Sequence, residues 1–289
     1  MMVSEIVGGA DRPRVTAGGR LPKVAVAMAA VLDATTPVRA FHHQQFSRPW
    51  LLAAKQATAA SVSVVIPARD EERTIGAIVA LVRTSLVEEV PIVDEIVVVD
   101  DGSVDATARR AAGEGAVVVE GPALGKGEAM ALAKGRGDLV VFLDGDVENF
   151  APHFVTGLLG PLFALPGIVL VKGRYERSLG DLPTGGGRVT ELVAKPVISL
   201  LFPELASVDQ PLAGETAVRA AALDELELAG GYGVEIGLLV DAARRYGTSA
   251  LAQVDLGSRR HRNRPLAELG VQARQVLATA LARAGVPVA

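Results

Sequence analysis

The pattern of hydrophobic and polar positions changes near residue 61. Residues 1–60 are rich in alanine, with scattered polar and proline positions, and predict no clear series of strands and helices. From residue 61 onward, short β-branched runs bounded by turn residues alternate with stretches whose apolar residues recur at helical spacing. This alternation is typical of an α/β fold, with a Rossmann-like, mostly parallel sheet flanked by helices on both faces.

The elements expected between residues 61 and 144 form a regular series. Strands are expected at 61–67, 94–100, 116–121 and 138–144, and helices at 71–86, 105–115 and 125–137. The second half predicts strands at 168–175 and 249–254, and helices at 188–201, 216–226, 234–246 and 266–284. We find no internal repeat and no low-complexity linker. We therefore expect an N-terminal extension (1–60) and one compact unit with a cleft between two halves, 61–173 and the more helical 174–289.

Composition excludes several classes of protein. The 289 residues carry 29 Lys and Arg against 33 Asp and Glu, a net charge of −4, whereas nucleic-acid binders need a strongly basic surface. The chain has no cysteine, so any metal must be held by carboxylates, imidazoles or water, and a reducing cytoplasmic compartment fits. The uncharged stretch between Glu148 and Lys172 contains three prolines, three glycines, Asn149 and His153, so we expect no membrane span.

Acidic residues follow three of the expected strands, in the segments 67–72, 100–103 and 144–146. In open α/β sheets ligands collect at the carboxyl ends of the strands, where these three segments would meet. Crowded carboxylates repel one another, so several ionised together indicate a cation or the hydrogen-bond donors of a ligand. Asp70 and Ser103 could equally be helix N-caps.

Of these three acidic segments, Asp144-Gly145-Asp146 points most specifically to a metal site. Two carboxylates one residue apart, with a glycine that allows close backbone approach, can hold Mg²⁺ or Mn²⁺ while the metal bridges a diphosphate. Such a metal would neutralise a departing nucleoside diphosphate. An ordinary acidic turn is the alternative, which the other two acidic strand ends disfavour.

Two glycine-rich segments carry a basic residue. Residues 185–187 followed by Arg188, at an expected helix start, offer backbone N–H groups, a helix dipole and a guanidinium group suited to phosphate. A flexible turn with a solvated arginine is equally compatible with this segment. Lys126 between Gly125 and Gly127 is not in a P-loop, because no Ser or Thr follows it. No G-x-G-x-x-G follows a strand, which argues against a dinucleotide oxidoreductase.

The four histidines differ in their surroundings. We expect His42 and His43 at the surface and His153 in a structural role at a helix start. His261 lies in the basic cluster 259–264, where neighbouring positive charge would leave a neutral imidazole able to bind a metal. The cluster could instead be a solvated face or an RNA patch, although the acidic total and the absence of interleaved aromatic residues argue against RNA.

Several motifs resemble known families. VVIPARDEE, VVVDDGSVDAT, GKGEA and VVFLDGD resemble the nucleotide-sugar glycosyltransferases of the GT-A fold. TGGGRVTELVAKP, QPLAGE, GYGVEIGLLVD and RRHRNRPL resemble the glucosyl-3-phosphoglycerate synthase family, which includes a mannosyl-3-phosphoglycerate synthase. The resemblance runs from about residue 61 to the C-terminus. It implies a homodimeric, retaining transferase that moves glucose from UDP-glucose, or mannose from GDP-mannose, to the 2-hydroxyl of 3-phosphoglycerate with Mg²⁺ or Mn²⁺.

The resemblance also implies roles for particular residues. The implied donor-binding residues are Pro67, Ala68, Arg69, Glu71, Asp101, Lys126, Asp144, Asp146 and Glu235. Of these, the implied catalytic residues are Lys126, Asp144, Asp146 and Glu235. Asp101 would lie beside the base, and Asp146 with His261 would ligate the metal. The implied acceptor-binding residues are Gly187, Arg188, Thr190 and Asn263.

The sequence leaves the identity of the sugar-nucleotide donor and the mechanism of retention partly open. Asp101 stands where we expect Ser in the glucosyl enzymes, and Thr216 stands where an aromatic residue would follow the QPL-x-GE motif. Because a carboxylate can accept both N–H groups of guanine's pairing edge, we also expect activity with GDP-linked donors. Two rival functions are a sugar-phosphate nucleotidyltransferase and a nucleotide-sugar sensor without turnover. No carboxylate stands out as a nucleophile, so same-face attack, with Lys126 and the metal stabilising the diphosphate, is favoured over a covalent intermediate.

Overall fold

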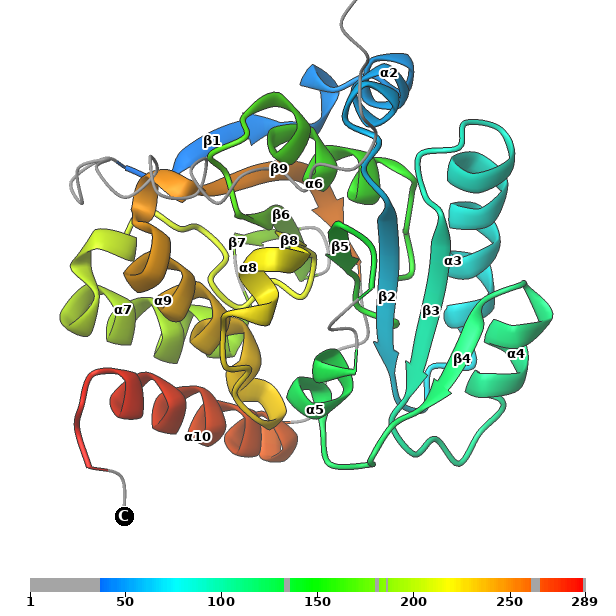
Figure 1. Ribbon diagram of the computed structural model, residues 1–289. Coiled ribbons are helices and arrows are strands. Elements are labelled where there is room, and N and C mark those ends of the chain that lie inside the picture. Colours follow the sequence, from blue (N-terminus) through cyan, green and yellow to red (C-terminus); the bar gives the residue numbers. More distant parts are fainter. Residues whose placement is uncertain (1–36, 133–135, 180–181, 186, 261–265, 288–289) are drawn as a thin grey trace, which may run out of the picture.

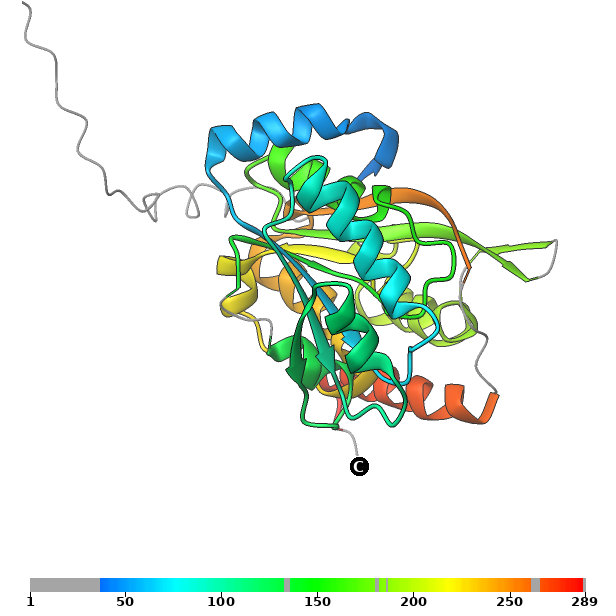
Figure 2. The same ribbon diagram turned by 90° about the vertical axis from the view of Figure 1, so that its right-hand side faces the viewer.

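The computed structural model describes residues 37–132, 136–179, 182–185, 187–260 and 266–287, which form a mixed sheet between two layers of helices (Figure 1). The strands are β1 (Arg39–His42), β2 (Val62–Ala68), β3 (Glu95–Asp100), β4 (Val117–Glu120), β5 (Leu139–Phe142), β6 (Leu170–Leu179), β7 (Leu182–Gly185), β8 (Thr216–Arg219) and β9 (Leu251–Arg259). Their order is β1-β9-β6-β8-β5-β2-β3-β4, and β7 pairs with β6. The β6–β7 hairpin extends away from the rest of the sheet (Figure 2).

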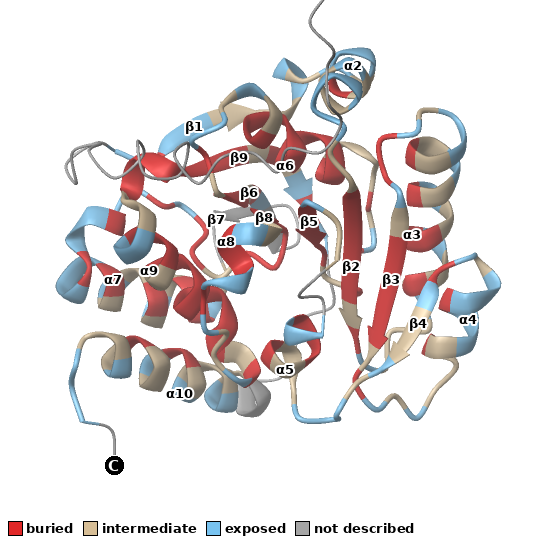
Figure 3. Ribbon diagram, viewed as in Figure 1, coloured by how far each residue is buried: buried red, intermediate tan, exposed pale blue. Residues whose placement is uncertain are grey.

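The two faces of the sheet carry separate hydrophobic cores. One face is covered by α2 (Arg48–Thr58), α3 (Ile75–Val82), α4 (Thr107–Gly113) and α6 (His153–Ala164). The other is covered by α5 (Lys126–Ala131), α7 (Lys195–Leu201), α8 (Ala220–Asp224), α9 (Val234–Tyr246) and α10 (Leu266–Arg283). Val64 and Ile66 of β2 belong to the first core and Val65 to the second, because successive side chains of a strand point to opposite faces. The central strands are therefore buried on both sides (Figure 3).

Strand direction agrees with the expected parallel sheet except at two places. β2 pairs in parallel with β3 and β5, and β3 with β4, so the carboxyl ends of these strands share one edge. β8 runs antiparallel between β5 and β6, and β7 runs antiparallel to β6. The helix expected at 216–226 is wrong in its first part, because 216–219 form β8 and only α8 follows. The four residues of β8, TAVR, contain no continuous apolar run, and their pairing partners decide their conformation.

Residues 37–60 also differ from expectation. β1 pairs in parallel with β9 at the edge of the sheet, with Phe41 opposite Val254. α2 begins after Ser47, whose hydroxyl accepts a hydrogen bond from the Trp50 backbone N–H at 3.4 Å, and it buries Leu51. The expectation that no clear strand or helix precedes residue 61 is thus wrong for residues 37–60. Residues 1–36 lie outside the described residues. The division of the chain into an extension and two halves stays a prediction. Within the described ranges, no helix is long and apolar enough to cross a membrane.

Three imidazoles stack where this edge meets α6. The ring centroids of His42 and His43 lie 4.6 Å apart, and those of His43 and His153 lie 4.3 Å apart. A ring nitrogen of His153 lies 3.0 Å from the carbonyl oxygen of Leu256 in β9. The structural role expected for His153 is therefore confirmed, while His42 and His43 are half-buried instead of fully at the surface. Burial, followed by the charge of neighbouring histidines, lowers the pKa of His43, and burial is also the main cause of the lowered pKa of His153.

We expect the protein to lose stability as the pH falls below 6.5, the usual pKa of these side chains. The unfolded chain binds protons at that pKa, whereas folded His43 and His153 bind them only at lower pH, so protons favour unfolding in this window. Thermal unfolding at about pH 7.5 and about pH 5.5 measures the loss, because free carboxylates change little over this range. The loss should be smaller in His153→Gln, and an equal loss in variant and wild type would contradict the assignment.

Candidate functional site

The three acidic segments meet at one edge of the sheet, as expected, because β2, β3 and β5 are parallel neighbours. Asp70 and Ser103 join the first two segments: the Val104 N–H donates to Asp70 Oδ1 at 2.8 Å, and the Asp70 N–H donates to Ser103 Oγ at 3.0 Å. Thr74 Oγ1 donates to the Gly145 carbonyl at 2.6 Å and so ties the third segment to the first. Asp70 and Ser103 therefore connect loops and do not cap α3 and α4.

The carboxylates at this edge are not equally available to a ligand. Asp100 Oδ1 accepts from the backbone N–H of Ser103 at 3.2 Å, and Glu72 Oε2 accepts from the Ala106 N–H at 3.1 Å. Asp101 is only 4% exposed, and its Oδ1 has no hydrogen-bond partner among the described residues. A buried acceptor left unpaired is costly, so Asp101 is the carboxylate that a donor group on a ligand would satisfy.

Two of the four remaining residues expected at the donor end of β2 lie beside Gly145. Ala68 and Glu71 lie against this glycine, and a Cβ there would be 3.5 Å from each side chain. Pro67 is half-buried in β2, whereas Arg69 is exposed. The donor-binding role of these four residues stays a prediction.

Lys126 links two carboxylates that are far apart in the sequence. Its Nζ lies 2.5 Å from Asp144 Oδ1 and 2.6 Å from Glu235 Oε1. Lys126 opens α5, and Glu235 lies in the first turn of α9. Burial acts to lower the pKa of Lys126, but the charges of Asp144 and Glu235 outweigh it and raise that pKa well above its usual value. The structure thus brings together three residues that the sequence assigned to the donor.

Close backbone packing explains the glycines around Lys126. A Cβ on Gly127 would lie 2.0 Å from the carbonyl oxygen of Ala229, so α5 can approach the segment before α9 only with glycine there. Glu128 Oε2 accepts a hydrogen bond from the Gly231 N–H at 2.9 Å and holds the same segment. The G-K-G motif therefore positions Lys126 against Glu235, a role that the sequence alone did not indicate.

Arg259, at the end of β9, binds both carboxylates of the D-G-D motif. Its Nη2 lies 2.7 Å from Asp144 Oδ2 and 2.9 Å from Asp146 Oδ1, and its side chain is only 2% exposed. Its Nη1 donates to the Tyr175 hydroxyl at 3.0 Å. The sequence placed Arg259 only in a basic cluster and assigned it no role. The one available signal was its position a few residues after the strand expected at 249–254.

A loop before β8 forms the back of this site. Lys172 is buried in β6, and its Nζ donates to the Ala213 carbonyl at 2.6 Å. Burial lowers the pKa of Lys172 to about 8, although the charge of Glu235 opposes the shift. Glu215 is fully buried, with Oε1 3.1 Å from Arg259 Nε. Sequence reasoning missed Lys172 and Glu215, although a lysine inside an apolar strand and the glutamate of QPLAGE were visible signals.

Gly214 in this loop gives a direct test of the geometry. A Cβ at this position would lie 1.9 Å from Asp144 Oδ1, so alanine must displace either the loop or the carboxylate. We expect Gly214→Ala to lower kcat/KM by about a hundred-fold, the effect of misplacing a catalytic group by ~1 Å. Steady-state kinetics measure this, with Gly167→Ala as the control because a Cβ there meets nothing within 4 Å. Equal activity of both variants would show that Asp144 does not need its present position.

The D-G-D carboxylates suit a hard divalent cation. Mg²⁺ and Mn²⁺ are commonly held by one or two carboxylates, together with water and the phosphate oxygens of a substrate. Asp144 and Asp146 are 20% and 17% exposed, and Arg259 balances their charge in this structure. No group of three or more His, Asp or Glu side chains that could hold a metal occurs in the described part of the chain. His261, the expected second ligand, lies outside the described residues.

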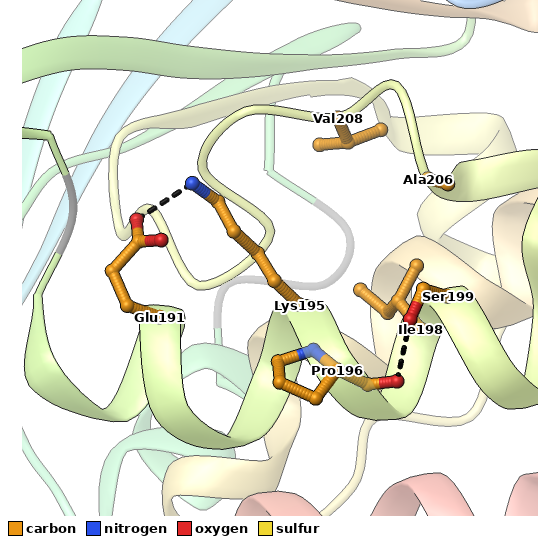
Figure 4. A pocket seen from close by; sticks show the side chains of 7 residues that line it. All are labelled: Glu191, Lys195, Pro196, Ile198, Ser199, Ala206 and Val208. Atoms are coloured by element: carbon orange, nitrogen blue, oxygen red, sulfur yellow. Dashed lines mark hydrogen bonds and ion pairs between the residues drawn. The ribbon is translucent and has the colours of Figure 1, made fainter.

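The expected acceptor residues begin the segment before α7. Gly187 is half-buried and accepts a hydrogen bond from the Glu191 N–H at 2.9 Å, Arg188 is exposed, and Thr190 is buried. Asn263 lies outside the described residues. A neighbouring hollow is lined by Glu191, Lys195, Pro196, Ile198, Ser199, Ala206 and Val208 (Figure 4). It contains none of the predicted site residues, and its Lys195 and Glu191 pair with each other at 2.6 Å.

The sequence and the fold of this chain match known proteins. Residues 63–195 match the model of glycosyl transferase family 2. A glucosyl-3-phosphoglycerate synthase of Mycolicibacterium paratuberculosis is 50% identical over 264 residues, covering 84% of this chain and 79% of that protein. The chain belongs to the glucosyl-3-phosphoglycerate synthase family. The resemblance seen in the sequence is thereby confirmed.

Solved structures of the family extend the comparison to bound ligands. The Mycobacterium tuberculosis synthase in complex with Mn²⁺, UDP-glucose and phosphoglyceric acid has a TM-score of 0.79 and 46% identity, covering 88% of this chain and 89% of that chain. A complex of the same enzyme with Mn²⁺, UDP and glucosyl-3-phosphoglycerate also has a TM-score of 0.79 and 46% identity, covering 88% and 90%. The expected GT-A fold class is confirmed.

Proposed function

We propose that this protein transfers glucose from UDP-glucose to the 2-hydroxyl of 3-phosphoglycerate, with retention at the anomeric carbon and with Mn²⁺ or Mg²⁺. The observation that carries the proposal is the Lys126 cluster, in which one buried cation contacts Asp144 of the D-G-D motif at 2.5 Å and Glu235 at 2.6 Å. The curated relatives are named glucosyl-3-phosphoglycerate synthases, and a solved structure of the Mycobacterium tuberculosis synthase contains UDP-glucose and phosphoglyceric acid. These relatives favour the glucosyl function over the mannosyl alternative.

The side chains of the site have different roles in this reaction. Asp146 would hold the divalent cation, which supplies positive charge to the departing diphosphate. Lys126 keeps its proton because its pKa is raised, so it stabilises negative charge on the donor and cannot serve as a base. Asp144 and Glu235 each offer carboxylate oxygens that can accept hydrogen bonds from sugar hydroxyls.

The positions of the carboxylates favour same-face attack. Asp144 and Glu235 are both paired with Lys126, and Glu215 is fully buried behind Arg259. None of these three is thus a free carboxylate able to attack the anomeric carbon. In same-face attack the departing phosphate oxygen takes the proton of the acceptor hydroxyl while the new glycosidic bond forms.

A product assay tests this function. The protein is incubated with UDP-glucose, 3-phosphoglycerate and Mn²⁺, and we expect UDP and a glucosylated phosphoglycerate in equal amounts. Release of pyrophosphate would instead identify a nucleotidyltransferase, and calorimetric binding of UDP-glucose without turnover would identify a sensor. A parallel reaction with GDP-mannose measures whether Asp101 permits a second donor.

Arg188→Ala should raise the half-saturating concentration of 3-phosphoglycerate by roughly ten-fold to a hundred-fold, because a charge-assisted bidentate contact is lost. The constant for UDP-glucose should change far less, which steady-state titration of each substrate measures. Arg245→Ala is the control, since Arg245 is exposed and pairs with Glu225 at 3.0 Å. Equal effects on both substrates would remove Arg188 from the acceptor site.

A homodimer and a cytoplasmic location stay predictions. The absence of cysteine fits a reducing compartment. Light scattering coupled to size exclusion would determine the oligomeric state, with a dimer as the expected result.

A further inference from the structure

Arg259 is shared between two sets of carboxylates. Its Nη2 contacts Asp144 and Asp146 on the side of the proposed cation site, at 2.7 and 2.9 Å. Its Nε faces Glu215 on the opposite side at 3.1 Å. Burial acts to lower the pKa of Arg259, but Glu215 and the other neighbours raise it, so the guanidinium stays charged.

Glu215 needs an explanation of its own. It is 0% exposed, and neither carboxylate oxygen has a hydrogen bond within the described residues. A buried carboxylate in that state is costly unless a nearby cation balances it. Arg259 balances the charge of Glu215 through their ion pair. We therefore expect Glu215 to act through Arg259.

The loop that carries Glu215 is built to hold this side chain in place. Lys172 donates to the Ala213 carbonyl at 2.6 Å, and the Gly173 N–H donates to the Glu215 carbonyl at 2.8 Å. Gly214 lies directly against Asp144. Glu215 and the D-G-D motif are therefore fixed relative to each other, with Arg259 between them.

We propose that Glu215 is a positioning residue that holds Arg259 as a stand-in for the divalent cation at the D-G-D carboxylates. The proposal rests on the cation site of the proposed function. Without the cation, Arg259 balances Asp144 and Asp146. When the cation binds Asp146, Arg259 gives up that contact, and Glu215 keeps the guanidinium paired and inside the site. Glu215 thus makes the release of Asp146 less costly and strengthens cation binding.

Glu215→Gln tests the proposal, because it keeps the size of the side chain and removes its charge. Arg259 then has Asp144 and Asp146 as its remaining carboxylate partners within 4.0 Å in the described ranges and holds them more tightly. We expect Mn²⁺ to bind this variant about ten-fold more weakly in calorimetry in the presence of UDP. The half-saturating Mn²⁺ concentration in turnover should rise by a similar factor, while kcat at saturating Mn²⁺ changes less. Glu225→Gln is the control, since this exposed carboxylate pairs only with Arg245 and Tyr246 in the described part of the chain.

The double variant Glu215→Gln/Arg259→Gln separates this role from a merely structural one. It removes both members of the buried pair, so neither Glu215 nor Arg259 is left as an unpaired buried charge, while Asp146 becomes available to the cation. We expect Mn²⁺ to bind the double variant at least as tightly as wild type, because it lacks Arg259, the one ion-pair partner of Asp146 in the described part of the chain.

Three outcomes would count against the proposal. Unchanged Mn²⁺ affinity in Glu215→Gln would overturn it. Weak binding in the double variant, equal to that of the single variant, would show that the effect does not pass through Arg259. Absence of Mn²⁺ binding by wild type in the presence of UDP would remove the cation site itself, and with it the cation in the proposed function, whereas the other two outcomes leave that function intact.

Discussion

Asp146→Ala is expected to lower turnover by roughly a thousand-fold, the loss that follows when a group that stabilises transition-state charge is removed. Asp146 is the D-G-D carboxylate that does not contact Lys126 in an ion pair, and its contact with Arg259 at 2.9 Å can be exchanged for a cation. The loss should persist at high Mn²⁺ because Asp144, the other carboxylate of the motif, is already paired with Lys126 and Arg259. Initial rates of UDP release across a Mn²⁺ titration measure it. The resemblance to the family extends the same expectation to His261→Ala.

Asp241→Ala is a matched control for Asp146→Ala. Asp241 is 18% exposed and pairs with Arg283 at 2.9 Å, so its burial and pairing are like those of Asp146. The control should lose stability but keep its turnover. If Asp146→Ala kept wild-type rates at limiting Mn²⁺, the proposed cation site would be wrong.

Lys126→Ala should have two effects of similar size. Removing the cation leaves Asp144 and Glu235 facing each other across a largely buried site, and breaking a buried ion pair in this way costs about 3–5 kcal/mol of unfolding free energy. The positive charge on the donor side is lost as well, so turnover should fall by roughly a hundred-fold to a thousand-fold. Urea unfolding and steady-state kinetics measure the two effects separately.

Lys195→Ala shows what a surface lysine contributes by comparison. Its Nζ lies 2.6 Å from Glu191 Oε1, a distance equal to that between Lys126 and Glu235, but both side chains are more than a third exposed. Exposed ion pairs contribute about 0–1 kcal/mol, so this variant should be nearly as stable and as active as wild type. An equal loss of stability in both variants would show that burial does not set the strength of the Lys126 pairs.

The local pattern of apolar residues was sufficient to predict the strands that form the expected donor-binding side of the site. The apolar runs of β2, β3 and β5 are buried on both faces, and such strands can be recognised without tertiary information. Because parallel strands end at one edge, the meeting of their acidic ends followed directly. The long helices α9 and α10 were also recognised, since their apolar residues recur over several turns.

Short elements escaped prediction for a physical reason. β1 and β8 have four residues each, like β4 and β5, but their sequences RAFH and TAVR lack the continuous apolar run by which β4 and β5 were recognised. β1 is a strand because the edge of β9 offers hydrogen-bond partners, and β8 is a strand because it fills the space between β5 and β6. Such pairing energy comes from distant residues and leaves no local signal.

The sequence by itself determined the α/β class and the D-G-D motif at a strand end, because each depends on residues that are close together in the chain, and the resemblance of its motifs to a known family pointed to Lys126 and Glu235. Only the tertiary structure decided that Lys126 joins Asp144 to Glu235, and that Arg259 contacts Asp144 across 115 positions of sequence. It also decided that Glu215 and Lys172 are buried behind them. Burial and charge pairing are properties of the folded packing, because they depend on which distant side chains share a space from which water is excluded.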